Sequence, residues 1–349
     1  MILNRSPIDI SRSEGCTLTG VLSVTGFLED AVTVIHGPSG CTHHNASLLH
    51  ASLAEIDEVK IPCFLSSNIN EEEVIFGGEQ ALLDALDAAE ARDPSLICVV
   101  STCIADTIGD DTAALCRQKR GVPVIYIPGA GFLGGGFSEG IRNALAALLN
   151  LADETGERAG EEILIVGEKN LEYEAEENFN EITRLLSLLD LAPGIRFVRH
   201  SSVSDCQKIG SAPMAILRES SLQPVGSILG SRFHIPIIPG FPVGTDGTSA
   251  FLKQLGACTG IDPGSALRDE EGLISDLYSS FDDLRCESVR LNRTGADPQT
   301  VFAAESALGA LQMKEVSGSH LLPLPYDPPV GIAGTRRMLN SWRRSLSRA

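Results

Sequence analysis

Short runs of β-branched and other apolar residues alternate along this chain with longer segments of helical periodicity. Each run is followed by turn-forming residues and then by a helical pattern, an order typical of parallel sheets covered by helices. The predicted strands are residues 31–35, 96–100, 122–127, 163–166, 195–198, 214–217 and 235–238. The predicted helices are residues 78–91, 111–120, 138–149, 176–189, 249–255, 267–280 and 298–311. The pattern therefore predicts an α/β protein.

Two breaks in the pattern predict three units. Residues 151–162 are polar and acidic and contain glycine, which is typical of a connection, and residues 259–265 interrupt the alternation again. A chain of 349 residues suits such a division, because single hydrophobic cores stop growing at roughly 250–300 residues. We expect an N-terminal α/β unit over residues 1–150, a second α/β unit over 151–262 and a smaller C-terminal unit over 263–349.

Charge and composition indicate which kinds of partner and which cellular compartment to expect. A net charge of −19 argues against nucleic acid, because neutralising phosphates requires an excess of Lys and Arg, and it favours a basic protein partner. No apolar stretch approaches the roughly 18–20 residues that span a bilayer, so no membrane partner is expected. Nine cysteines are too sparse for a disulfide scaffold, and the N-terminus has no apolar run typical of a secretion signal, which predicts the reducing cytoplasm.

Candidate chemistry gathers at three cysteines in segments of small residues and turn-formers. Cys16 lies in E-G-C-T-L-T-G, Cys41 in H-G-P-S-G-C-T and Cys103 in S-T-C-I-A-D-T-I-G-D-D. They are 25 and 62 residues apart, far wider than the C-x-x-C pairs of sequence-local metal sites. A metal site using them must be assembled in space, where loops leave the carboxyl ends of parallel strands.

The local contexts support such an assembly. Cys41 and Cys103 each follow a predicted strand, and Asp110 or Asp111 is expected to cap the helix after Cys103. Cys16 lies between glycines in a segment without a strong secondary-structure signal. We expect all three on loop ends of the N-terminal unit. The remaining cysteines, such as Cys98 in the apolar run 96–100, are expected to be small buried hydrophobic residues.

These segments resemble the cluster-binding segments of the nitrogenase component 1 family. Members carry a first Cys beside glycines near the N-terminus, a second in H-G-P-x-G-C and a third in S-T-C-x-x-x-x-I-G-D-D, and this chain matches their order and spacing. The segments 128–132 and 242–246 extend the likeness over most of residues 10–260. The resemblance implies Rossmann-like parallel-sheet units around a groove, with the iron–sulfur cluster on the first unit.

Within this family, residues 40–45 and 323–331 are most similar to the branch that reduces tetrapyrroles. The chain is shorter than nitrogenase subunits and has no clear counterpart of the segments that hold the molybdenum cofactor, which disfavours dinitrogen reduction. The resemblance implies a homodimer, a [4Fe-4S] cluster on Cys16, Cys41 and Cys103, and a nickel tetrapyrrole substrate that is reduced and cyclised. It also implies an ATP-hydrolysing iron–sulfur reductase as partner. ATP is expected on that partner, because this chain lacks a G-x-x-x-x-G-K-[ST] loop.

Proton donors are expected beside the cysteines. His43 and His44 directly follow the Cys41 segment, where one could protonate the macrocycle or contact a substrate carboxylate, or simply start a helix. Asp106, three residues past Cys103, is a candidate proton donor or oxygen ligand, or else a helix cap or a solvent-exposed residue.

Several alternatives stay open at this point. In a homodimer, one four-iron cluster on the twofold axis would take two ligands from each chain and leave one cysteine spare. A cluster in each chain would need a fourth ligand, and six cysteines together could hold a larger cluster. The function could also be that of another tetrapyrrole reductase, similar to protochlorophyllide reductase, or of a non-catalytic scaffold for metallocluster assembly. A cluster-free sugar- or nucleotide-binding protein is the remaining alternative.

Overall fold

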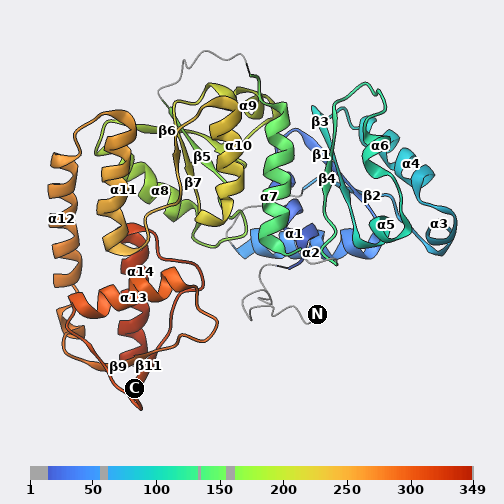
Figure 1. Cartoon of the computed structure of the whole chain (residues 1–349). Helices are drawn as coiled ribbons and strands as arrows, with labels where there is room; N and C mark the ends of the chain where they lie inside the picture. The colour runs from blue at the N-terminus through green and yellow to red at the C-terminus, as the bar shows by residue number, and fades with distance from the viewer. Residues whose placement is uncertain (1–14, 56–61, 133–134, 155–161, 348–349) are drawn as a thin grey trace. The chain divides into compact units, whose positions relative to one another are not determined.

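A computed structural model describes residues 15–55, 62–132, 135–154 and 162–347 (Figure 1). The described residues fall into two compact units, one within residues 10–175 and 193–239 and the other within 176–192 and 240–349. Residues 155–161 of the predicted connection lie outside the described ranges, and the division at residues 150 and 262 stays a prediction. No helix in the described ranges is long and apolar enough to cross a membrane.

The larger unit contains two four-stranded sheets (Figure 1). The first has the order β2-β1-β3-β4 with every pair parallel, and the second has the order β6-β5-β7-β8. β1 and β3 are almost entirely buried because helices cover both faces of the sheet. The strands are β1 Ala31–His36, β2 Phe64–Ser66, β3 Leu96–Ser101, β4 Val124–Pro128, β5 Glu162–Val166, β6 Ala192–Phe197, β7 Ala215–Leu217 and β8 Ile237–Ile238.

Alternate residues of β3 feed two hydrophobic cores. Ile97 and Val99 pack with α4 and α6 on one face of the first sheet. Cys98 and Val100 pack on the other face with α1 and α7, in a core that continues to the second sheet. The helices of this unit are α1 Thr17–Thr25, α2 Ser39–Glu55, α3 Glu71–Phe76, α4 Glu79–Glu90, α5 Cys103–Ile108, α6 Thr112–Cys116, α7 Phe137–Leu148, α9 Val203–Lys208 and α10 Gln223–Phe233.

The smaller unit combines long helices with the short parallel sheet β10-β9-β11. Its core includes Trp342, which is fully buried and donates its indole N–H to the Pro323 carbonyl at 2.9 Å. Arg184 bridges the buried carboxylates of Glu181 and Glu270. The elements are α8 Ala175–Ser187, α11 Gly244–Thr259, α12 Gly264–Ser279, β9 Ser288–Leu291, α13 Pro298–Ala310, β10 Lys314–Glu315, β11 His320–Leu322 and α14 Gly331–Leu346.

The predicted α/β class is confirmed, and every strand predicted from the sequence is present. Two helix predictions had wrong lengths: α6 ends at Cys116 rather than Arg120, and α11 extends over Gly244–Thr259. The prediction that the three cysteines lie on loop ends was also wrong in detail. Cys41 and Cys103 lie inside the first turns of α2 and α5, and Cys16 is the N-cap of α1.

The cores make stability sensitive to alkali. Burial raises the pKa of Cys116 and of Cys206 from 9.0 to about 12, and it raises the pKa of Cys98 further. These thiols stay protonated in the folded state and ionise when the chain unfolds. The free energy of unfolding is therefore unaffected by them below pH 9 and falls as the pH rises above 9. At about pH 10 we expect ionisation of the three thiols together to lower the free energy of unfolding by ~4 kcal/mol.

Denaturant unfolding of the iron-free protein between pH 8 and 10 measures this loss. Cys206→Ala should remove about a third of the thiol-dependent decline. An identical pH dependence in the variant would contradict the assignment.

Candidate functional site

The three cysteines of the predicted cluster site all lie at helix N-termini. Cys16 precedes α1 with extended backbone angles, φ −93° and ψ −178°, and its thiol lies 3.7 Å from the Thr19 hydroxyl. Cys41 is in the first turn of α2, and Cys103 is the first residue of α5. The first N–H groups of a helix have no intrahelical acceptor, so they are free to hydrogen-bond an anionic group bound at these cysteines.

The sheet explains why Cys41 and Cys103 approach each other. β1 and β3 are parallel neighbours, with His36 aligned to Ser101 at their carboxyl ends. The chain leaves these ends into α2 and α5, and the Thr102 N–H donates to the His36 carbonyl at 3.1 Å. Parallel strands therefore deliver both cysteines to one sheet edge.

Cys41 lies close enough to both Cys16 and Cys103 for negative charge on either of them to act on its thiol. The pKa of Cys41 is raised, first because the thiol is half-buried and then because negative charge on Cys16 and Cys103 opposes its ionisation. Cys16 itself is exposed, and Cys103 is half-buried. A cation bound at Cys41 would relieve this repulsion.

The chemistry of these three residues fits an iron–sulfur cluster, although their side chains do not form a preorganised metal site. Cysteine thiolates are the usual ligands of such clusters. Buried polar atoms without a hydrogen-bond partner in the described part of the chain flank two of the cysteines: Thr17 Oγ1 follows Cys16, and Thr42 Oγ1 and Asn45 Oδ1 lie beside Cys41. Over the same described ranges, no three or more His, Cys, Asp or Glu side chains are grouped so that they could hold a metal ion.

The predicted proton donors lie beside the cysteines and face solvent. His43 and His44 are exposed on α2, within one turn of Cys41. Asp106 is exposed in the first turn of α5. Asp106 is also close enough for its charge to favour the protonated form of His36.

Sequence analysis missed a buried polar cluster behind the cysteines, formed by His36, Ser67 and Asp110. His36 Nδ1 lies 2.9 Å from the Ser67 hydroxyl, and His36 Nε2 lies 2.9 Å from an Asp110 carboxylate oxygen. Asp111, rather than Asp110, caps α6 by accepting from the Ala114 N–H at 2.9 Å. The H-G-P and G-D-D letters of the two motifs signal His36 and Asp110, but not their contact.

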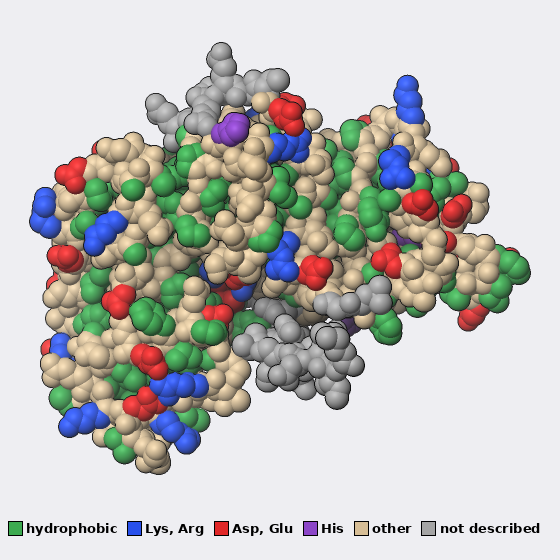
Figure 2. All heavy atoms as spheres, in the orientation of Figure 1, with side chains coloured by type: hydrophobic (Ala, Val, Ile, Leu, Met, Phe, Trp, Pro, Cys, Tyr) green, Lys and Arg blue, Asp and Glu red, His purple; other side chains and the backbone are tan. Residues whose placement is uncertain are grey.

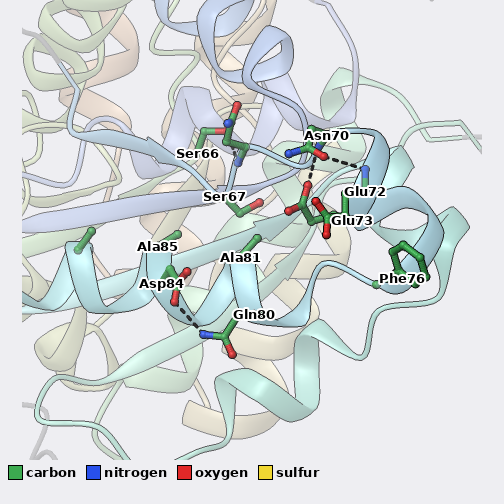
Figure 3. A pocket seen from close by; sticks show the side chains of 13 residues that line it. Ser66, Ser67, Asn70, Glu72, Glu73, Phe76, Gln80, Ala81, Asp84 and Ala85 are labelled. Atoms are coloured by element: carbon green, nitrogen blue, oxygen red, sulfur yellow. Dashed lines mark hydrogen bonds between the residues drawn. The ribbon is translucent and has the colours of Figure 1, made fainter.

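A second missed feature is the exposed tip of α3. Phe76 is 81% exposed and Ile75 is 72% exposed, next to the acidic residues of the helix's first turn. Figure 2 shows hydrophobic side chains gathered on the surface where Figure 1 places α3. Beside the tip lies an open cleft of about 560 Å³ with Ser67, Glu72 and Asp84 in its lining (Figure 3). Neighbouring exposed apolar side chains commonly mark an interaction surface.

Parallel sheets with thiols gathered at one edge define the class as an α/β protein with a sulfur-lined site. Comparison with known protein families then identifies the family of this chain. The chain belongs to the nitrogenase component 1 type oxidoreductase family, whose sequence profile matches residues 16–320.

Individual relatives agree with this membership. The chain is 30% identical over 246 residues to the nitrogenase iron-molybdenum cofactor biosynthesis protein NifE of Clostridium pasteurianum, covering 69% of this chain and 52% of that protein. It is 25% identical over 290 residues to the nitrogenase molybdenum-iron protein alpha chain of the same organism, covering 79% and 53%. The chain thus spans about half the length of these relatives.

A solved structure described as nitrogenase Cp1 at pH 6.5 shares the fold. It covers 100% of this chain and 77% of its own, with a TM-score of 0.69 and 19% sequence identity. This agreement supports the parallel-sheet architecture on which the sulfur-lined site is built.

Proposed function

We propose that this chain is the catalytic component of a two-component, ATP-dependent reductase that acts on a nickel tetrapyrrole. The substrate would be nickel-sirohydrochlorin a,c-diamide, reduced by several electrons and closed to a γ-lactam during synthesis of the nickel coenzyme of methanogens. The placement of Cys41 and Cys103 after adjacent strands, with Cys16 near Cys41, carries the proposal. Residues 40–45 and 323–331, which resemble the tetrapyrrole-reducing branch, direct it to this substrate.

In this proposal the three cysteines hold a [4Fe-4S] cluster, the cofactor that the family resemblance implies. When bound, the cluster supplies low-potential single-electron transfer, which reduction of a stable conjugated macrocycle requires. The chain's part is to present the thiolates at helix N-termini. In a homodimer, each chain would contribute its three cysteines to cluster binding.

Protons for the reduction would come from side chains at the same edge. His43 and His44 are exposed one turn after Cys41, and Asp106 is exposed one turn after Cys103. Each group can exchange protons with solvent and reach a substrate above the edge. We propose these three residues as the proton donors.

The reductase partner would dock on the tip of α3, which offers apolar side chains beside acidic ones. Val74, Ile75 and Phe76 are exposed, and the first turn of the helix carries Glu71–Glu73. The neighbouring cleft adds the carboxylate of Asp84, as Figure 3 shows. This surface suits a partner with an apolar contact ringed by Lys and Arg, and the net charge of −19 would speed their encounter. ATP would bind to that partner.

A second candidate function is a scaffold on which a metallocluster is assembled before transfer. The observation that favours it is the similarity to NifE proteins, whose name describes cofactor biosynthesis. The NifE of Methanococcus maripaludis is 28% identical over 330 residues, covering 89% of this chain and 66% of that protein.

Anaerobic reconstitution separates the two functions. The iron-loaded chain is mixed with a nitrogenase-type reductase, ATP and nickel-sirohydrochlorin a,c-diamide, and the tetrapyrrole is followed by absorbance and mass spectrometry. ATP-dependent appearance of a reduced, cyclised product supports the reductase. Transfer of an intact cluster to an acceptor protein, without change in the tetrapyrrole, supports the scaffold. A colourless protein that takes up no iron would contradict both.

A further inference from the structure

A buried histidine ties together the carboxyl ends of three adjacent strands. His36 ends β1, and its ring lies between Ser67, just after β2, and Asp110, in the segment that follows β3 and α5. Its carbonyl accepts from both the N–H and the hydroxyl of Thr102, at 3.1 and 2.9 Å. The ring is fully buried, so these contacts are shielded from water.

Each hydrogen bond of this cluster can be assigned a donor and an acceptor. Burial lowers the pKa of His36 more than Asp110 raises it, which leaves the ring neutral with one donor and one acceptor. The Gly37 N–H donates to the Ser67 oxygen at 3.0 Å, and the Ser67 hydroxyl can then donate to Nδ1. Nε2–H donates to Asp110. Every polar group of the cluster is satisfied by this tautomer.

The same carboxylate holds the turn between α3 and α4. Both Asp110 oxygens lie 3.1 Å from the Gly78 N–H. A Cβ on Gly78 would come within 2.7 Å of Asp110 Oδ2 and 3.1 Å of His36 Cε1, so only glycine allows this approach. Gly77, with φ +96°, directly follows Phe76. The exposed tip of α3 is therefore two residues from the Asp110 contact.

We propose that Asp110 is a positioning residue that couples the tip of α3 to the two cysteine segments, so that partner docking and occupancy of the thiol site influence each other. His36 begins the segment that leads to Cys41, and Asp110 ends the segment that starts at Cys103. A shift of the α3–α4 turn on docking alters the Asp110 hydrogen bonds and, through His36, both segments. This inference rests on the proposed function, because the docking partner is the proposed reductase.

The link within the chain is tested without any partner. Hydrogen exchange is compared for the iron-free wild type, Asp110→Ala and Asp110→Asn, with Asp111→Asn as matched control because Asn preserves the α6 cap. We expect faster exchange in Asp110→Ala at both the 77–79 turn and the 36–41 segment, a smaller change in Asp110→Asn and none at these sites in the control. Faster exchange at only one segment, or at neither, would overturn the inference.

The coupling is tested with the proposed reductase. Its affinity is measured for the iron-loaded and the iron-free chain, and the ratio of the two gives the coupling, on the order of tenfold for an effective link. Asp110→Ala should bring this ratio close to one, whereas Phe76→Ser should weaken both affinities and keep the ratio. A wild-type ratio that persists in Asp110→Ala refutes the coupling. Absence of reductase binding to wild type refutes the proposed function, while the exchange measurement still decides the internal link.

Discussion

Replacing Cys41 with Ala is expected to remove the bound iron and the visible absorbance of protein purified without oxygen, while leaving the chain folded. Removing a group that merely orients a metal ligand costs about 10–100-fold in metal affinity, so loss of a thiolate ligand should exceed roughly 100-fold. Cys41 is only half-buried in the first turn of α2, and Ala is compatible with a helix. Iron content, absorbance and electron paramagnetic resonance measure the loss, and circular dichroism checks the fold.

Two other cysteines provide matched controls for this experiment. Cys98→Ala changes a fully buried residue in β3 of the same sheet, and Cys286→Ala changes an exposed one in the smaller unit. Both variants should keep their iron and colour. Cys103→Ala should behave like Cys41→Ala, and retention of iron in either variant would remove that residue from the set of ligands. Cys16→Ala distinguishes the cluster arrangements, because a cluster shared on a twofold axis leaves one cysteine of each chain unused.

The strands of the larger unit, except the three-residue β2, were predictable because burial on both faces demands apolar runs. Leu96–Ser101 contains no charge, and its alternate residues face two different cores, so its composition alone indicates a central parallel strand. The strands of the smaller unit were not predicted. β10 covers only Lys314–Glu315, and so short a strand has no detectable alternation.

The helices that carry Cys16 and Cys41 were missed for two different reasons. Every residue of α1 is buried, so it lacks the polar face that gives a helix its sequence period. It also contains three threonines, two valines and a glycine, all weak helix formers. α2 opens with S-G-C-T-H-H-N, which has low helix propensity and few apolar residues. Tertiary packing, not local preference, decides both helices.

Part of the candidate site was predictable from the sequence and part was not. The three cysteine segments were recognisable from their letters and spacing. The contact between His36 and Asp110 joins residues 74 positions apart, and it follows from the order β2-β1-β3, which no local pattern encodes. The exposed tip of α3 was also missed, because whether the apolar residues after E-E-E are buried depends on what packs against them. The sequence thus indicated the chemistry, while the supporting contacts required the fold.

Adding a single methyl group where α1 crosses α7 is expected to destabilise the larger unit strongly. A Cβ on Gly140 would lie 2.0 Å from the Thr17 carbonyl oxygen, and a Cβ on Gly20 would lie 2.0 Å from the Phe137 carbonyl oxygen. Both clashes are with backbone, so a side-chain rotation cannot relieve them, and the helices must separate. We expect Gly140→Ala or Gly20→Ala to lower the free energy of unfolding by about 3 kcal/mol or more, at the upper end of overpacking effects.

Denaturant unfolding of the iron-free protein measures this loss, with Gly40→Ala as the matched control. Gly40 is also helical and in the same unit, but nothing lies within 4 Å of its added Cβ, so the control should be neutral or slightly more stable. Because Cys16 caps α1, displacement of that helix by Gly140→Ala should also reduce iron uptake. A Gly140→Ala protein as stable as the Gly40→Ala control would show that the two helices do not meet through their glycines, and the placement of Cys16 beside Cys41 would lose its structural basis.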